Sequence, residues 1–279
     1  EIIYKTWKNL DRSTKKKIHL IANYNLISQQ FRKLKFKTKL LKTDVFSKNN
    51  NLDLLKVMDI PLKFSNPFNV SRKEAAKYVS KSLNVAHKLS EKKKIEGFIN
   101  CPINKKLISK DGKIGITEYL ASKCKIKDNS EVMLIYNRNL SVVPVTTHLD
   151  IKDVSSKIST KKIIKKINTI NNYYKKIFKK KPKIGILGLN PHNAELRKNS
   201  EEIKIINPAI RKLRSNGINI SNLLVADTVF INSYKEFDVI VGMYHDQVLS
   251  PFKALYNFDA INITLGLKYT RLSPDHGPA

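Results

Sequence analysis

The feature that most constrains the fold of this chain is the alternation of short apolar runs with longer amphipathic segments. Apolar runs of strand length occur at 18–22, 97–100, 132–136, 141–145, 184–188, 218–224, 237–241 and 260–264. Segments with helical periodicity occur at 26–34, 71–89 and 154–178. Strands that alternate with helices are typical of α/β proteins. The sequence therefore predicts a layered α/β fold with a largely parallel sheet.

Two local signals predict where helices begin. Ser71 is followed three residues later by Glu74, which is the spacing of a capping box at a helix start. The helix that it opens is expected to end at about Leu89. Thr117 and Glu118 are expected to cap a shorter helix.

The charge balance is strongly positive, with 53 Lys and Arg against 23 Asp and Glu and a net charge of +30. Such an excess is found in proteins that bind nucleic acid or another polyanion. It also results from a coding bias towards Lys, Asn and Ile, and all three residues are abundant here. Because the lysines are scattered along the chain, we favour the second explanation and expect no nucleic-acid partner. A positive field would still attract a small anionic substrate.

The sequence also bears on location. No apolar run approaches the ~20 residues that a membrane helix needs, so no membrane partner is expected. The first residues show no secretory signal, and Cys101 and Cys124 form neither a disulfide framework nor a metal motif, which favours the cytoplasm. Because the chain begins in helix-like sequence and stops in loop-like sequence at 275–279, we expect further residues to flank it.

Three of the six histidines share one context, because each follows a predicted strand. They are His148, His192 and His245. In open α/β sheets the carboxyl ends of the strands line the ligand crevice. Three neutral imidazoles with an open position make a catalytic metal site. Each could instead be a hydrogen-bonded loop histidine, but the recurrence of the position favours the metal site.

The sequence contains no GxGxxG, Walker A, GxSxG or HExxH motif, so a standard Rossmann dinucleotide site is not predicted and the cofactor-binding residues stay unknown. The C-terminal stretch gathers residues that suit a clamp for phosphate or carboxylate. These residues are Lys253, Asn262, Arg271, Ser273 and Asp275.

Several short motifs, in a fixed order, resemble the 4-hydroxythreonine-4-phosphate dehydrogenase (PdxA) family of vitamin B6 biosynthesis. They are CPINK at 101–105, GITEYLA at 115–121, VTTH at 145–148, GLNPH at 188–192, ADT at 226–228, YHDQ at 244–247, NITLGL at 262–267, and Arg271 followed by SPDHG at 273–277. GLNPH and YHDQ together are very specific. The resemblance extends from about residue 69 to the last residue of the chain.

The resemblance implies an isocitrate/isopropylmalate-dehydrogenase-like fold, with two α/β/α subdomains and a cleft between them. We expect residues 1–108 and 249–279 to form the first subdomain. Residues 109–248 are expected to form the second, which carries the histidines, with boundaries good to about ten residues. The family also implies a homodimer with the active site at the interface.

The resemblance further implies a divalent metal (Zn²⁺, Mg²⁺ or Co²⁺) and the residues that contact metal and substrate. The metal ligands would be His148, His192 and His245, and the substrate contacts Thr117, Lys253, Asn262 and Arg271. Lys253 is expected to take part in catalysis. Asp246, next to a metal ligand, could either orient it or accept a proton.

The reaction that the resemblance implies is the oxidation of 4-phosphooxy-L-threonine by NAD or NADP. The product, 2-amino-3-oxo-4-phosphooxybutanoate, would lose CO₂ to give 3-amino-2-oxopropyl phosphate, on the route to pyridoxal/pyridoxine 5′-phosphate. The small phosphorylated substrate would be the principal partner. Two alternatives of other classes are a metal-dependent hydrolase and a polyanion-binding protein.

Three departures from the family pattern concern the substrate. Ile116 stands where the family has His, the segment 248–250 lacks the family's Gly and Pro, and Asn193 replaces Ala. At Ile116 a substrate contact is lost, or Lys113 replaces it, or the substrate differs. A related dehydrogenase of D-threonate or D-erythronate 4-phosphate is therefore an alternative.

Overall fold

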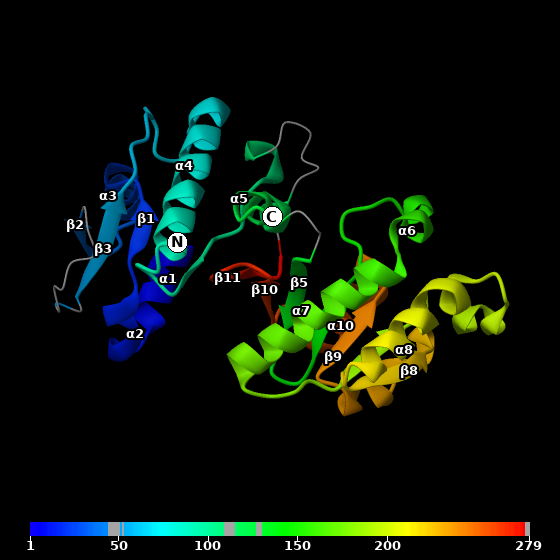
Figure 1. The fold of residues 1–279 in the computed structure, drawn as a ribbon. Helices are drawn as coiled ribbons and strands as arrows, with labels where there is room; N and C mark the ends of the chain where they lie inside the picture. The colour runs from blue at the N-terminus through cyan, green and yellow to red at the C-terminus, as the bar shows by residue number, and fades with distance from the viewer. Residues whose placement is uncertain (44–50, 52, 109–114, 127–129, 277–279) are drawn as a thin grey trace. The chain divides into compact units, whose positions relative to one another are not determined.

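The computed structural model describes residues 1–43, 51, 53–108, 115–126 and 130–276. The chain divides into two compact units (Figure 1). The first comprises Glu1–Lys92 with Lys106–Lys110, and the second comprises Lys93–Lys105 with Asp111–Ala279. Among the described residues, no helix is both long enough and apolar enough to cross a membrane.

The first unit contains a three-stranded parallel sheet with helices. Its strands, in spatial order, are β1 (Leu20–Ala22), β3 (Leu54–Asp59) and β2 (Lys39–Thr43). Its helices are α1 (Ile2–Asn9), α2 (Arg12–Lys17), α3 (Tyr24–Lys33) and α4 (Arg72–Glu91). Ile27 and Phe31 of α3 pack on Val57 of β3 to form the centre of its core. The expected cap is present, because Ser71 Oγ accepts a hydrogen bond from Glu74 N at 3.4 Å.

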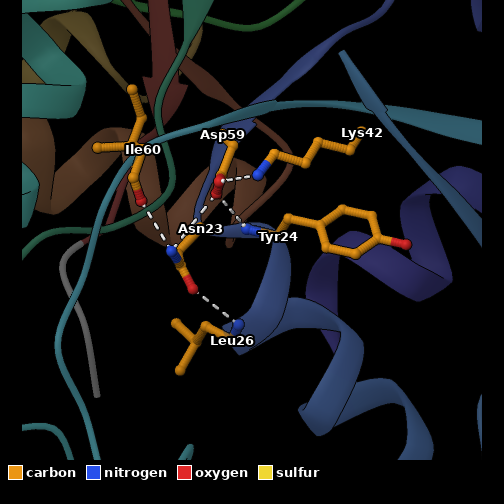
Figure 2. Close-up of polar contacts among 6 residues, drawn as sticks. All are labelled: Asn23, Tyr24, Leu26, Lys42, Asp59 and Ile60. Atoms are coloured by element: carbon orange, nitrogen blue, oxygen red, sulfur yellow. Dashed lines mark hydrogen bonds and ion pairs between the residues drawn. The ribbon is translucent and has the colours of Figure 1, made fainter. Parts of the chain in front are cut away.

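A polar network fixes the carboxyl ends of β1 and β3 to the start of α3 (Figure 2). Asn23 Oδ1 accepts from Leu26 N at 2.8 Å, and Asn23 Nδ2 donates to the carbonyl of Ile60 at 2.9 Å. Asp59 accepts from Tyr24 N at 2.8 Å and forms an ion pair with Lys42, also at 2.8 Å. These bonds all lie within the first unit and hold the start of α3 against its sheet.

The second unit is built on an eight-stranded mixed sheet. In spatial order its strands are β4 (Gly97–Ile99), β11 (Thr270–Pro274), β10 (Ile261–Leu265), β5 (Val132–Tyr136), β6 (Ser141–Pro144), β9 (Val239–Gly242), β7 (Ile184–Leu187) and β8 (Ile220–Leu224). The strands from β6 to β8 pair in parallel, as do β11 and β4. The pairs β5–β6, β5–β10 and β10–β11 are antiparallel. Short turns join β5 to β6 and β10 to β11, as antiparallel neighbours allow.

Helices cover both faces of this sheet, so the predicted α/β layering is confirmed. Its α-helices, among the described residues, are α5 (Ile116–Lys123), α6 (Ile151–Lys157), α7 (Thr160–Phe178), α8 (Asn207–Ser215), α9 (Ala226–Val229) and α10 (His245–Tyr256). Val239 and Val241 of β9 pack with α7 and α8 on one face, whereas Ile240 packs with α9 and α10 on the other. Figure 1 shows α7 crossing over β5.

Two details of the second unit differ from the sequence-based expectation. The predicted helix at 154–178 is two helices, because Ser159 caps α7 by accepting from Lys162 N at 3.2 Å. Strand β11 was not predicted because its buried positions are polar: Arg271 and Ser273 face inward while Leu272 is only partly buried. This pattern buries the guanidinium of Arg271 against the sheet.

The compact units also differ from the predicted division at 1–108 plus 249–279 against 109–248. Residues 249–276 belong to the second unit, because β10 pairs with β5 and β11 with β4 in one sheet. Residues 93–105 belong there as well, since they contain β4.

Candidate active site

Three neighbouring parallel strands present the three predicted histidines at one edge of the sheet. Strand β9 lies between β6 and β7 and pairs in parallel with both. His148 follows β6, His245 follows β9 and His192 follows β7. The carboxyl ends of parallel strands lie at the same edge, where open α/β sheets bind their ligands. The strand-end argument from sequence therefore agrees with the topology.

His148 and His245 lie close together at this edge. Their ring centroids are 6.1 Å apart. Two imidazoles that share one ion at about 2 Å from each nitrogen have centroids roughly 5–6.5 Å apart, so this pair fits two ligands of one metal. Asp246 Oδ1 lies 2.6 Å from His245 Nδ1. That contact leaves Nε2 of His245 as the nitrogen that can bind a metal.

His192 is presented differently. It is exposed and lies in the turn η2 (Pro191–Leu196), in which His192 has a left-handed backbone with φ of 48°. Within the described ranges, no three His, Cys, Asp or Glu side chains are grouped so that they could hold one metal ion. The structure thus brings two of the three predicted ligands together in one chain.

Glu118 is a site residue that the sequence analysis treated only as a helix cap. Its Oε1 lies 3.8 Å from His148 Nδ1 and accepts a hydrogen bond from Thr147 Oγ1 at 3.2 Å. A Cβ on Gly115 would overlap Glu118 Oε2, so glycine at 115 leaves room for this carboxylate. Burial raises the pKa of Glu118, but the interactions with His148 and Thr147 outweigh it and bring the pKa to about 2.

We expect this carboxylate to make the metal-free protein sensitive to acid. A lowered pKa in the folded state stabilises the fold above the unfolded value of 4.5, and that contribution is lost as the pH falls towards about 2. Glu118→Gln should therefore lower the free energy of unfolding at neutral pH, by an amount that shrinks below pH 4.5. Urea unfolding at a series of pH values measures this. A deficit that stays constant down to about pH 3 would contradict the assignment.

Arg271 lies at the centre of a second polar cluster. It is only 2% exposed, its Nε donates to Asn100 Oδ1 at 2.8 Å, and its Nη1 donates to Thr264 Oγ1 at 3.0 Å. Thr264 Oγ1 in turn lies 3.4 Å from Thr117 Oγ1. Burial lowers the pKa of Arg271 to about 10, so the guanidinium is still charged at neutral pH. Because Thr117 and Glu118 are consecutive in α5, this helix joins the arginine cluster to the histidine pair.

Two further predicted substrate contacts lie on α10 and β10. Lys253 Nζ forms an ion pair with Asp275 Oδ2 at 3.2 Å and lies 5.0 Å from the centre of the Phe258 ring. Asn262 Oδ1 is buried and makes no hydrogen bond within the described part of the chain. A buried acceptor of this kind is normally satisfied by water or a ligand.

Ile116 packs into an apolar cluster. It is partly buried against Leu120, Cys124, Leu267 and Tyr269. Lys113, which could replace the family's histidine, lies outside the described residues. We expect Ile116→His to lower the free energy of unfolding by about 1–2 kcal/mol, because a polar ring would lie among apolar groups. Chemical denaturation checks this, with Ile116→Val as the control. Equal stability of the two variants would show that the side chain at 116 does not need to be apolar.

Four residues that shape this edge escaped the sequence analysis as site residues: Asn100, Thr264, Glu202 and Gln247. Asn100 follows β4, which runs antiparallel to β6, so the rule of shared carboxyl ends does not predict its place beside Arg271. Gln247 belongs to the YHDQ motif but has no reactive group. Glu202, which is fully buried, lies in a π-helical turn (η3, Glu202–Ile206) with no motif to mark it.

The fold and the site define a protein of the α/β class with paired histidines and a buried arginine at the carboxyl edge of a mixed sheet. The family described as "Pyridoxal phosphate biosynthetic protein PdxA" matches residues 14–279. The chain belongs to this family.

Relatives of known name agree with this membership. A 4-hydroxythreonine-4-phosphate dehydrogenase of Sulfurihydrogenibium sp. is 42% identical over 228 residues, which cover 80% of this chain and 69% of the relative. One of Aquifex aeolicus is 43% identical over 188 residues, covering 66% of this chain and 58% of the relative. The chain thus spans less than two thirds of the length of the Aquifex relative.

Solved structures share the fold. The 4-hydroxythreonine-4-phosphate dehydrogenase of Burkholderia phymatum aligns with a TM-score of 0.82 at 26% identity, covering 99% of this chain and 85% of that one. The enzyme of Klebsiella pneumoniae aligns with a TM-score of 0.80, also at 26% identity, over 93% of this chain and 82% of that one.

Proposed function

We propose that this chain catalyses the oxidation of 4-phosphooxy-L-threonine by NAD⁺ or NADP⁺, in a reaction that depends on a divalent metal. The observation that carries the proposal is the pair of histidines on adjacent strand ends, with ring centroids 6.1 Å apart and joined through α5 to the buried Arg271. The identity of the substrate is inferred from the names of the relatives. The reaction moves a hydride from C3 to the nicotinamide and leaves a ketone.

We assign separate roles to the residues of the site. His148 and His245 would hold the metal together with His192, and the bound metal, Zn²⁺, Mg²⁺ or Co²⁺, would lower the pKa of the substrate hydroxyl. Arg271, Lys253, Asn262 and Thr117 would bind the phosphate and carboxylate groups. Asp246 would either orient His245 or accept the hydroxyl proton, since its carboxylate is exposed and touches the ring. The product is a β-keto acid, which loses CO₂ readily.

We propose that the active unit is a homodimer with the site at its interface. Within the described ranges the chain groups His148 with His245 but does not add His192 to them. A second copy of the chain could supply the missing histidine from its own exposed η2 turn.

The alternative substrates are D-threonate and D-erythronate 4-phosphate. A relative from Oceanobacillus iheyensis, whose name proposes a D-threonate 4-phosphate dehydrogenase, is 37% identical over 202 residues. The apolar packing of Ile116, in place of the family's histidine, also favours a changed pocket.

Absorbance of NADH or NADPH tests the proposal. Purified protein would be given each of the three phosphorylated acids with NAD⁺ or NADP⁺ and with Zn²⁺, Mg²⁺ or Co²⁺. We expect the largest kcat/KM with 4-phosphooxy-L-threonine, and CO₂ release to follow. Preference for D-threonate 4-phosphate would instead identify the related dehydrogenase. Phosphate release without reduced cofactor would indicate a hydrolase, and nucleic-acid binding without turnover a polyanion-binding protein.

A further inference from the structure

A continuous set of hydrogen bonds joins the loops that carry the three histidines. Thr146, two residues before His148, donates from both its backbone N, at 3.1 Å, and its Oγ1, at 2.7 Å, to the carbonyl of Met243. These bonds fix the loop after β6 to the loop after β9. Because Met243 lies two residues before His245, the two loops cannot move independently without breaking both bonds.

Gln247 continues this set towards the third loop. Its side-chain Oε1 accepts from Met243 N at 2.7 Å, and its Nε2 donates to the carbonyl of Gly188 at 2.6 Å. The side-chain amide of Gln247 thus accepts from the β9 loop and donates to the β7 loop, which carries His192. Neither a carboxylate nor an apolar side chain of the same size can make both bonds.

Glu202 holds the same β7 loop from its other side. Its Oε1 accepts from the backbone N of Leu189 at 2.9 Å and of Asn190 at 2.8 Å. Its Oε2 accepts from Asn190 Nδ2 at 3.1 Å. The residue is 0% exposed, and no lysine or arginine forms an ion pair with it in the described part of the chain. Burying a carboxylate costs free energy, and here hydrogen bonds from the loop offset that cost. The same bonds hold the loop in one conformation.

The glycine at 188 is part of the same arrangement. A Cβ there would overlap Asn193 Oδ1 and would lie 3.3 Å from Glu202 Oε1. Glycine therefore lets the loop approach Glu202 closely, immediately before the turn that presents His192. Position 188 also provides the carbonyl to which Gln247 donates.

We infer that Gln247 and Glu202 are positioning residues that set the spacing of the three histidine loops for metal binding. The inference rests on the proposed function, since it takes His148, His192 and His245 as the ligands. Neither residue needs to touch metal or substrate. Their effect is to hold the His192 loop against the loops that carry His148 and His245, so that His192 is presented in one conformation, whether it binds the metal of its own chain or that of a second copy.

Two near-isosteric variants test this. Gln247→Glu keeps the acceptor for Met243 N but opposes a carboxylate to the Gly188 carbonyl. Glu202→Gln keeps the volume but replaces one acceptor with a donor that faces other donors. Glu236→Gln is the matched control, because Glu236 lies outside the three loops and forms an exposed ion pair with Lys183. Co²⁺ is the probe, since its visible absorption reports both binding and coordination geometry.

We expect Gln247→Glu and Glu202→Gln to bind Co²⁺ about 10–100-fold more weakly than the parent protein, with an altered absorption band. Glu236→Gln should stay within about threefold of the parent. Hydrogen exchange of the metal-free protein adds a second measurement: the amides of Leu189 and Asn190 should exchange faster in Glu202→Gln. Circular dichroism identifies any variant that fails to fold. If Glu202→Gln does not fold, the Co²⁺ affinity of Gln247→Glu tests the inference.

Unchanged Co²⁺ affinity in folded Gln247→Glu, or in both variants, would overturn the inference even if their melting temperatures fall. That result would leave the proposed function intact, because the parent protein would still bind the metal. A parent protein that binds no Co²⁺ and reduces no NAD(P)⁺ would instead remove the proposed function and this inference with it.

Discussion

Replacing Arg271 with alanine is expected to lower kcat/KM for 4-phosphooxy-L-threonine by about thirtyfold or more, which corresponds to ~2 kcal/mol. The guanidinium is buried, charged and aligned by Asn100 and Thr264. Its removal would take away the proposed charge-assisted bond to an anionic substrate and would leave Asn100 Oδ1 without the donor Arg271 Nε. We expect most of the loss to appear in KM, because the interaction anchors the substrate before reaction.

Arg271→Lys separates the charge from the geometry. Lysine keeps the positive charge but cannot reproduce the planar fork that bonds two partners at once. Its kcat/KM should lie between those of the parent and Arg271→Ala. The control is Arg138→Ala, at an exposed position in the turn between β5 and β6. Circular dichroism should show that each variant is folded. Unchanged kinetics in folded Arg271→Ala would reject its role in substrate binding.

The second large effect is expected from the histidine pair. His148→Ala and His245→Ala should each weaken Zn²⁺ or Co²⁺ binding by about a hundredfold or more and abolish metal-dependent turnover, because each would remove a proposed metal ligand. His192→Ala should have an effect of the same order if it is the third ligand. Isothermal titration with Zn²⁺ measures the affinities.

The control for this series is His19→Ala, which changes a partly buried histidine in the other compact unit. It should leave the metal affinity unchanged. If His192→Ala binds Zn²⁺ as tightly as the parent while the other two variants do not, the metal has only two histidine ligands from this set. If all three variants bind normally, the metal site lies elsewhere.

Most strands could be predicted because they depend on local patterns, but no predicted run covers β2, β3 or β11. Runs such as 132–136 and 237–241 are apolar enough to mark buried strands, and His148, His192 and His245 follow three of them. The sequence does not state that β6, β9 and β7 are neighbours. That order depends on long-range packing, and the topology confirmed the shared edge.

Other parts of the site could not be predicted because their signals are either inverted or non-local. The inward-facing Arg271 gives β11 a polar inner face, so it does not resemble a strand. Glu202 acts on a loop twelve and thirteen residues earlier in the chain, and no periodic pattern records that contact. At Ile116 the resemblance indicated a lost substrate contact, whereas packing against Leu120 and its neighbours became visible only in the structure.

The most direct test of the account is a crystal structure of the protein grown with Zn²⁺, with data collected at the zinc absorption edge so that the ion is located by its anomalous signal. We expect one strong peak at the carboxyl edge of β6, β9 and β7. Nitrogens of His148, His192 and His245 should lie about 2.0–2.3 Å from it, all from one chain or with His192 from a second copy. A peak bound by other residues, or one from which every copy of His192 is more than about 12 Å away, would contradict it.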